Sequence, residues 1–192
     1  MKRYSRFTMP FPYPVAQSIE AANVMEYPMI CFNCGRTEKD ANGGYSANST
    51  YSEGTKNGML GVVIHEVGHN FFPMIINSDE RQWTWMDEGL NTFCEYLTEE
   101  LFDNNFPVGR GPAYKMIDYM KLPKDQLEPI MTNSENINNF GANAYGKPAT
   151  GLNMLRETIM GRESFDYAFK EYARRWAFKH PTPYDFFHCI NN

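Results

Sequence analysis

Val63-Ile64-His65-Glu66-Val67-Gly68-His69-Asn70 is the stretch from which both the fold and the chemistry can be inferred, together with Trp85-Met86-Asp87-Glu88-Gly89 downstream. His65 and His69 are four positions apart, so a helix places both imidazoles on one face, one turn apart. Glu66 follows the first histidine and leans into the same opening. The pattern therefore predicts a helix that presents two imidazoles and a carboxylate together.

Two neutral imidazoles and one carboxylate are typical of a zinc site that keeps its fourth position open for water. Glu88 is the candidate third ligand, because eighteen residues separate it from His69 and it would arrive from a second helix. We therefore predict one zinc ion held by His65, His69 and Glu88. Glu66 is placed to take a proton from a water that the metal has made more acidic, so we predict that it is the general base.

The competing interpretation is an exposed helix turn that carries two unrelated histidines. The flanks of the motif favour a buried helix, because they are apolar at Leu60, Val63, Ile64, Val67 and Phe71. A buried helix rarely carries two histidines and a glutamate without partners for them.

The composition indicates a globular chain with one hydrophobic core. Its 192 residues suffice for one domain, and 42% hydrophobic with 21% charged residues exclude a disordered chain. The net charge of −5 and the absence of a basic run give no reason to expect a nucleic-acid partner. No apolar run approaches membrane-spanning length, and no signal-type apolar core follows the basic residues 1–6, so the sequence does not indicate a compartment.

Four cysteines are present, at Cys31, Cys34, Cys94 and Cys189. Cys31 and Cys34 have the spacing of a redox or zinc-binding pair, but a closed four-thiolate site would require the other two to converge on them. We favour thiols without a metal role, or a local disulfide, over a second metal. Cys94 is expected to fill space in the core.

The segment before the histidine motif is expected to be extended. Residues 15–19 predict a short strand, and residues 21–32 are mostly apolar with Glu26 as the one charge. Pro28 confines that second segment to a sheet edge or ends it early. An edge strand leaves backbone groups free to pair with an extended peptide, so Glu26 is either solvated or directed at a ligand. Residues 35–55 are rich in Gly, Asn, Ser and Thr and predict a surface loop.

Two helices are expected around the candidate site. The first should run over residues 55–72, where Pro73 stops it, and the second over residues 84–102. Glu95 lies seven positions beyond Glu88 and so shares its helix face. It is either a partner that fixes the tautomer of a ligand histidine or a solvated surface glutamate.

The later part of the chain is expected to be helical in pieces. Residues 103–143 carry little regular pattern apart from a short helix over 112–122. Pro148 predicts the first turn of the next helix, and Gly161 predicts its end. Ser164 is a candidate cap for the helix that follows.

Three motifs in this order give the chain a family resemblance. His65-Glu66-Val67-Gly68-His69, with Glu88 after eighteen intervening residues, resembles the gluzincin metallopeptidases. Val24-Met25-Glu26-Tyr27-Pro28 upstream and Ala144-Tyr145-Gly146-Lys147 downstream narrow the resemblance to the aminopeptidase N and leukotriene hydrolase family. The resemblance extends from about residue 11 to residue 187.

The resemblance implies an α+β, mostly helical fold: a thermolysin-like zinc metallopeptidase catalytic domain with a small edge-strand sheet. It also implies that His65, His69 and Glu88 bind one Zn²⁺ ion and that Glu66 is the general base and proton shuttle.

Two further roles are implied by position in the family motifs. Glu26, with Met25 beside it, falls on the family's Gly-x-Met-Glu-Asn segment, in which the glutamate binds the free α-amine of the substrate. Tyr145 falls on the tyrosine that stabilises the oxyanion, a task suited to a phenol donor. The chain departs from the segment at both ends, where Asn23 replaces the glycine and Tyr27 the final asparagine.

The implied activity is that of a zinc aminopeptidase acting on peptides with a free N-terminus. The family's N-terminal β-domain and C-terminal helical domain have no counterpart in residues 1–192, so we expect a single, truncated catalytic domain with flanking domains in a longer polypeptide. One alternative is an epoxide hydrolase of the leukotriene-hydrolase type. Another is a peptide-binding module that has lost catalysis.

Overall fold

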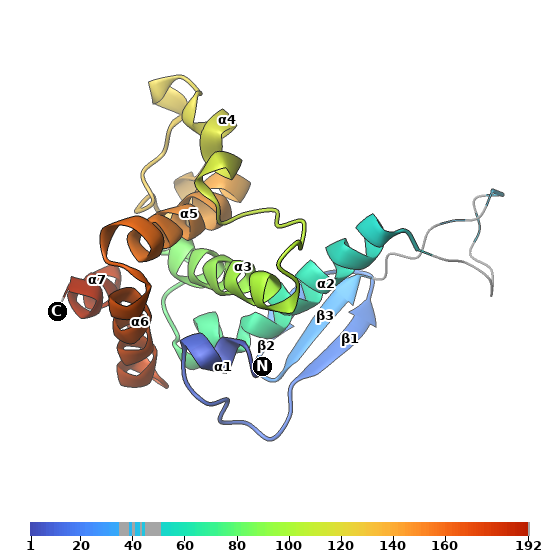
Figure 1. Ribbon diagram of the computed structural model, residues 1–192, viewed down its shortest axis with the longest axis horizontal. Coiled ribbons are helices and arrows are strands. Elements are labelled where there is room, and N and C mark those ends of the chain that lie inside the picture. The colour runs from blue at the N-terminus through green and yellow to red at the C-terminus, as the bar shows by residue number, and fades with distance from the viewer. Residues whose placement is uncertain (35–38, 40, 43, 45–50, 192) are drawn as a thin grey trace.

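The computed structural model describes residues 1–34, 39, 41, 42, 44 and 51–191. In this part of the chain, helices and one small sheet surround a hydrophobic core (Figure 1). The predicted architecture, mostly helical with a small sheet, is confirmed. Most of the predicted surface loop over residues 35–55 lies outside the described residues.

The sheet has the strand order β1-β3-β2. Strand β1 (Gln17–Ala21) pairs in parallel with β3 (Ile30–Cys34), and β2 (Met25–Tyr27) pairs antiparallel with β3. The apolar segment over residues 21–32 is divided into β2 and β3 by a turn at residues 28–29, so the first strand ends early at Pro28, as one of the two predicted alternatives stated. Pro28 has no N–H to continue a ladder, which favours the turn. Strand β2, which carries Glu26, is left at an edge of the sheet.

The two cysteines of β3 point to opposite faces of the strand, since they are three positions apart and side chains alternate. Cys31 is buried as a free thiol, so the local disulfide that we considered is not formed. Cys94 is fully buried in the core, as predicted.

Helix α2 (Glu53–Gly68) carries the histidine motif and begins at Ser52, whose side chain accepts a hydrogen bond from a backbone N–H of the first turn. The predicted end at Phe72 was wrong. The regular helix ends at Gly68, and a wider turn, η1 (Asn70–Ile75), follows it. Within η1, Phe72 has extended angles of φ −127° and ψ 111°, as a residue before proline favours, and Pro73 follows in the cis form.

Gly68 allows two other elements to approach the end of α2. A Cβ atom there would overlap Tyr4 Oη and Asn91 Oδ1. The Tyr4 hydroxyl donates a 2.9 Å hydrogen bond to Asn91 Oδ1, and Asn91 Nδ2 donates a 2.8 Å bond to the His65 carbonyl. This buried network joins α1 (Tyr4–Phe7) to both helices of the candidate site.

The second predicted helix is confirmed in extent. It consists of a wide first turn, η2 (Trp85–Gly89), and the regular helix α3 (Leu90–Phe102). Figure 1 shows α3 beside α2, with the sheet on the other side of α2.

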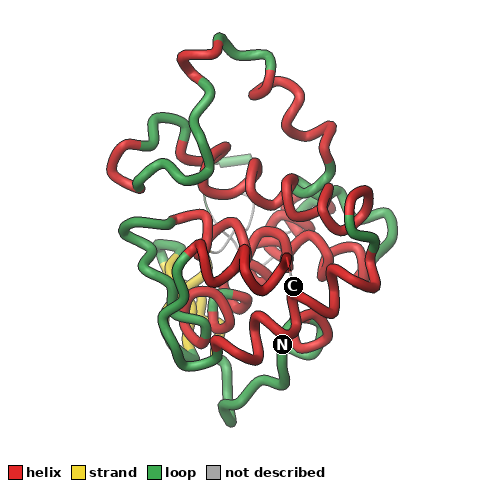
Figure 2. The backbone as a smooth tube through the Cα atoms, turned by 90° about the vertical axis from the view of Figure 1, so that its left-hand side faces the viewer, coloured by secondary structure: helices red, strands yellow, loops and turns green. Residues whose placement is uncertain are grey.

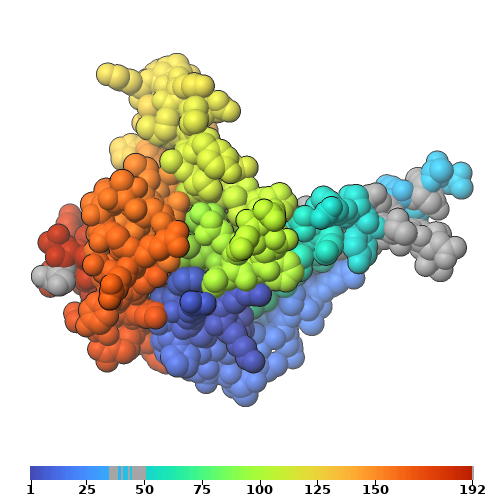
Figure 3. Space-filling view, in the orientation of Figure 1, coloured from blue at the N-terminus to red at the C-terminus, as the bar shows by residue number. Residues whose placement is uncertain are grey.

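The rest of the chain forms short and long helices (Figure 2). They are η3 (Ala113–Met116), α4 (Ile117–Met120), η4 (Lys124–Gln126), η5 (Ser134–Asn136), η6 (Gly141–Gly146), α5 (Lys147–Met154), η7 (Leu155–Ile159), α6 (Arg162–Trp176) and α7 (Pro183–Asn191). The helix predicted over residues 112–122 is therefore divided between η3 and α4, which belong to the segment that projects at the top of Figure 3.

The three residues predicted to mark helix boundaries had different outcomes. Pro148 lies in the first turn of α5, as predicted. Gly161, with φ 82°, separates η7 from α6 and occupies the N-cap position, so Ser164 is not the cap and lies inside the first turn.

The core contains aromatic residues from both halves of the chain. Its largest fully buried side chains are Tyr4, Tyr172, Phe71, Phe72, Phe93, Phe165, Phe169, Phe186, Ile75, Ile76, Met86 and Leu90. Among the described residues, every helix falls short of the length and apolar character that a bilayer-spanning segment needs.

Candidate metal centre and active site

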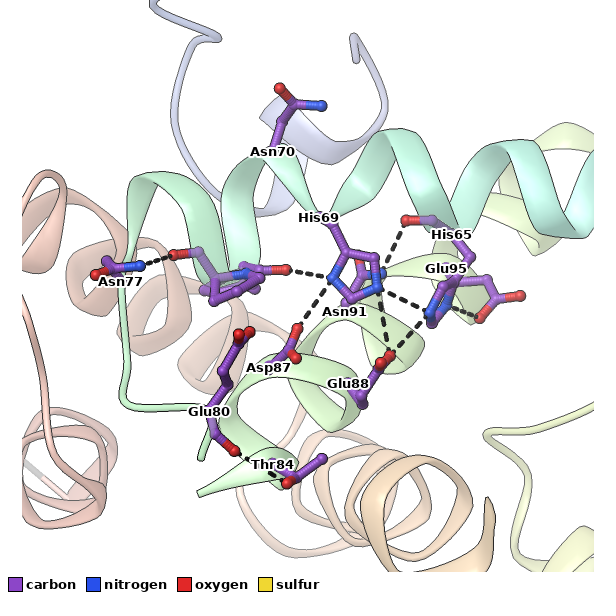
Figure 4. Close-up of polar contacts among 12 residues, drawn as sticks. His65, His69, Asn70, Asn77, Glu80, Thr84, Asp87, Glu88, Asn91 and Glu95 are labelled. Carbon is purple, nitrogen blue, oxygen red and sulfur yellow. Dashed lines mark hydrogen bonds and ion pairs between the residues drawn. The ribbon is translucent and has the colours of Figure 1, made fainter. Parts of the chain in front are cut away.

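Two neighbouring helical segments bring three predicted ligands together (Figure 4). His65 lies near the end of α2, His69 follows the last residue of that helix, and Glu88 lies in η2. The two histidine Nε2 atoms are 3.0 Å apart. Glu88 Oε2 lies 3.0 Å from His65 Nε2 and 3.3 Å from His69 Nε2. The three donor atoms thus form a small triangle.

The triangle fits a zinc ion in size and in chemistry. Nitrogen and oxygen ligands lie about 2.0–2.1 Å from tetrahedral zinc, which places the ligand atoms about 3.3 Å from one another. The observed separations of 3.0–3.3 Å are close to that value. His65 and His69 are only 8% and 1% exposed, so the donors lie in a largely water-excluded place.

The other ring nitrogens are held by partners that fix the direction of the imidazoles. His65 Nδ1 is 2.9 Å from Glu95 Oε2. His69 Nδ1 is 2.8 Å from the Phe72 carbonyl oxygen and 3.0 Å from Asp87 Oδ1. When Nδ1 donates its hydrogen to these acceptors, Nε2 carries the lone pair that a metal requires. Of the two readings of Glu95 that the sequence left open, the geometry favours the histidine partner.

The charges around the triangle favour a cation. Burial disfavours a charged imidazole, but hydrogen bonds to Glu88 and Glu95 outweigh it and raise the pKa of His65 to about 9. Despite its own burial, Glu88 has a pKa well below its usual range, because both imidazoles hydrogen-bond to its charged form. These shifts show that the pocket stabilises positive charge at the position of the triangle.

Glu66 lies next to the triangle without a partner of its own. The residue is 6% exposed, and within the described part of the chain its side chain makes no hydrogen bond. Burial raises the pKa of Glu66 to about 7, although the nearby imidazoles lower it. A buried carboxyl group that is not tied to another residue can accept and return a proton.

Tyr145 and Glu26 approach the triangle from different segments. The Tyr145 ring stacks on the His65 ring, with centroids 5.8 Å apart and planes 28° apart. A Glu26 carboxylate oxygen lies within 4.8 Å of donor atoms of His69, Asp87 and Glu88.

Met25 differs from Glu26 in its position. The two residues are neighbours in β2, so their side chains point to opposite faces of the strand. Met25 is exposed while Glu26 is half-buried. The structure thus brings the side chain of Glu26 to the candidate site, but not that of Met25.

A cavity of about 770 Å³ opens beside the triangle, between α2, α3 and the loop at residues 106–110. Its walls include His65, Glu66 and Tyr145. It is large enough to receive part of a small ligand.

Three residues of this region were not predicted from the sequence: Asp87, Glu99 and Arg110. Asp87 precedes the third ligand, and its contact with His69 depends on the wide turn of η2, which has no sequence signal. Glu99 lies one turn beyond Glu95, so the helical period could have identified it. Arg110 comes from an irregular loop and lies over the Tyr145 ring at 4.4 Å, which no pattern predicts.

The fold and the three metal-ligating side chains can be compared with those of known protein families. Residues 4–192 match the model of the peptidase family M1 domain. The chain therefore belongs to peptidase family M1.

Curated relatives of the chain include three aminopeptidases. Endoplasmic reticulum aminopeptidase 1 of Homo sapiens is 26% identical over 133 residues, which cover 67% of this chain and 14% of the relative. Glutamyl aminopeptidase of Sus scrofa is 24% identical over 162 residues, covering 80% and 17%. Aminopeptidase M1-A of Oryza sativa subsp. japonica is 24% identical over 191 residues, covering 93% and 21%. The chain thus spans about a fifth or less of the length of these relatives.

Solved structures with a similar fold include M1 zinc metallopeptidases of Deinococcus radiodurans. A mutant bound to a Tyr-Ser-Ala substrate matches with a TM-score of 0.70 at 18% identity, over 99% of this chain and 38% of that chain. A further crystal structure from that organism gives a TM-score of 0.68 at 17% identity, over 99% and 38%. These likenesses show that this chain shares its fold with both structures.

Proposed function

We propose that the protein is a zinc-dependent aminopeptidase that hydrolyses the N-terminal peptide bond of peptides, and that residues 1–192 form a single, thermolysin-like catalytic domain. The observation that carries this proposal is the triangle of His65, His69 and Glu88, with the unpaired carboxyl group of Glu66 beside it. Membership of peptidase family M1 supports the same reaction class.

His65, His69 and Glu88 would hold the zinc ion through Nε2, Nε2 and Oε2. Zinc bound there would supply Lewis acidity, which acidifies a water molecule and polarises the scissile carbonyl. Glu66 takes the proton from the attacking water and then gives it to the leaving amine. Its burial and lack of another partner keep its carboxyl group available for both transfers.

Glu26 and Tyr145 supply the remaining contacts in this proposal. The Glu26 carboxylate pairs with the α-ammonium group of the substrate, so that the first carbonyl, and no later one, reaches the triangle. The Tyr145 hydroxyl donates a hydrogen bond to the carbonyl oxygen as negative charge develops on it. Met25 contributes through the backbone of β2, because its side chain faces away from Glu26.

Two other functions are less well supported. An epoxide hydrolase would need a long apolar channel, whereas carboxyl groups and an arginine line the cavity that opens at Glu66. A peptide-binding module without catalysis would not require a zinc-sized triangle with a buried carboxyl group at its side. Flanking domains in a longer polypeptide remain a prediction.

The first experiment measures zinc and activity in the same preparation. The purified chain should contain about one zinc ion per molecule, the content of a mononuclear site. Glu66→Gln should retain that zinc and lose peptide hydrolysis. Hydrolysis at the wild-type rate by Glu66→Gln would show that Glu66 is not the base.

The second experiment tests the exopeptidase assignment. Peptides with a free N-terminus should lose their first residue, and the same peptides with an acetylated N-terminus should resist cleavage. Glu26→Gln should raise KM for the free peptides, because the partner of the ammonium group loses its charge. Equal cleavage of free and acetylated peptides would contradict the assignment.

A further inference from the structure

Glu99 is a buried carboxyl group whose partner is not supplied by the protein. The residue is 5% exposed and lines the cavity beside the triangle. Within the described part of the chain, burial and the charges of Glu95, His65 and Arg110 act on its carboxyl group, and no hydrogen bond to it contributes. A buried acid without a partner is costly, so its position in a cavity suggests that a ligand supplies the partner.

The opposite wall of the cavity leaves room for such a ligand. Gly54, Gly58 and Gly61 lie along one face of α2, about three, two and one turns before His65. A Cβ atom at Gly58 would meet nothing within 4 Å, so the missing side chain leaves open space. At Gly61 the nearest atom to such a Cβ would be Glu99 Oε1, at 3.2 Å, so the carboxyl group reaches across to this face.

The cavity lies on the side of the triangle away from the amine-binding position. Glu26 groups with His69 and Asp87, whereas His65 and Glu66 line the cavity. Figure 4 shows the same division, with Asp87 beside His69 and Glu95 beyond His65. A peptide with its amine at Glu26 and its first carbonyl at the triangle would therefore direct its second residue into the cavity.

We propose that Glu99 is a specificity-determining residue that selects peptides with lysine or arginine as the second residue, by pairing with the cationic end of that side chain. This inference rests on the proposed aminopeptidase function, because the substrate position is taken from it. Glu95 adds negative charge to the same cavity wall, since its Oε1 atom lies near Gly61 while its Oε2 atom holds His65.

The charges in the cavity agree with this assignment. Burial raises the pKa of the Glu99 carboxyl group to about 8, and the neighbouring Glu95 carboxylate adds to the rise. An entering cation would offset that cost of ionisation. Arg110 is the cation of the protein that lines the same cavity, but it is exposed, lies over the Tyr145 ring and forms no ion pair with Glu99.

The test compares two peptide series with the same free N-terminal leucine. One has lysine or arginine in second place, and the other has norleucine, which resembles lysine in length but carries no charge. Both kcat/KM and the dissociation constant, the latter by calorimetry, are measured for the zinc-loaded wild type, Glu99→Gln and Glu163→Gln. Glu163 is an exposed glutamate of α6 outside the cavity and serves as the matched control.

The wild type should favour the lysine peptide about tenfold or more, as expected for a charge pair out of water. Glu99→Gln should reduce that preference to near unity while changing the norleucine peptide little, and Glu163→Gln should keep it. An unchanged preference in Glu99→Gln, or none in the wild type, would overturn the inference.

Calorimetry separates this inference from the proposed function. A lysine preference in binding that depends on Glu99, without any hydrolysis, would support the cavity assignment and count against the aminopeptidase. Hydrolysis without a preference at the second residue would support the aminopeptidase and count against the cavity assignment. Failure of every peptide to bind would overturn both.

Discussion

Replacing Glu95 by alanine tests whether the residues behind the triangle determine metal binding. Glu95 Oε2 accepts the hydrogen of His65 Nδ1 at 2.9 Å and so holds the ring with Nε2 toward the other ligands. Without this acceptor the ring can rotate, and the tautomer with the hydrogen on Nε2 becomes accessible. We expect Glu95→Ala to weaken zinc binding while the helix itself remains folded.

The size of the effect follows from the role of such partners. Loss of a hydrogen bond behind a ligand histidine lowers metal affinity about 10–100-fold. At equal, saturating zinc this corresponds to about 1.4–2.7 kcal/mol of lost stabilisation. A chain of this length changes its melting temperature by about 2–4 °C per kcal/mol. The rise in Tm on adding zinc should therefore be smaller by about 3–11 °C.

The assay combines a competition titration against a fluorescent zinc chelator with thermal unfolding in the presence and absence of zinc. Glu95→Gln keeps an oxygen that accepts the Nδ1 hydrogen, so its affinity should lie between those of the wild type and Glu95→Ala. Glu163→Ala, on the exposed surface of α6, should match the wild type. If Glu95→Ala binds zinc as tightly as the wild type, the orientation of His65 does not depend on Glu95.

Four other substitutions test separate parts of the structure. Gly68→Ala should lower the free energy of unfolding by about 1–3 kcal/mol, because its methyl group would overlap the Tyr4 hydroxyl. Gly58→Ala should raise the free energy of unfolding by about 0.5–1 kcal/mol, because its methyl group would meet nothing and alanine favours a helix over glycine. Denaturant titration measures both changes. Tyr145→Phe should lower kcat about 100-fold with little change in KM, because the lost hydrogen bond strengthens only as charge develops; steady-state kinetics on a free peptide shows the split. Glu99 has a pKa of about 8 in the folded state, against an ordinary value of 4.5. Its contribution to stability is therefore lost as the pH rises through that interval. Between about pH 5 and about pH 8, the Tm of Glu99→Gln should fall less than the Tm of the wild type.

Helical periodicity made part of the site predictable. His65 and His69 share a helix face because they are four positions apart, and Glu95 shares a face with Glu88 because they are seven apart. Which residues share a helix face depends only on their spacing along the chain, not on where the helix packs in the fold. The meeting of Glu88 with the histidines depends on tertiary packing, which the sequence suggested only through the resemblance to a known family.

Other features depend on backbone geometry that leaves no periodic signal. The wide turn after Gly68 places the Phe72 carbonyl oxygen against His69 Nδ1, although a regular helix was expected there. Early termination at Pro28 was one of two expected outcomes, but the second strand, β3, was not predicted, since the apolar pattern does not distinguish one long strand from a short hairpin. Arg110 reaches Tyr145 from an irregular loop, where spacing along the chain carries no directional information.

Three glutamates of the site have different proposed roles, and they differ in the residues to which each carboxyl group is hydrogen-bonded. Glu88 contacts both ligand imidazoles, Glu95 contacts the far nitrogen of His65, and the buried Oε2 atom of Glu66 has no hydrogen-bond partner among the described residues. Amide substitution should therefore separate them, because it keeps the size of each group and removes its charge. Glu88→Gln should lose zinc and, with it, hydrolysis, whereas Glu66→Gln should lose hydrolysis alone. If both variants lost zinc to the same extent, Glu66 would belong to the metal-holding set, and another group would have to move the proton.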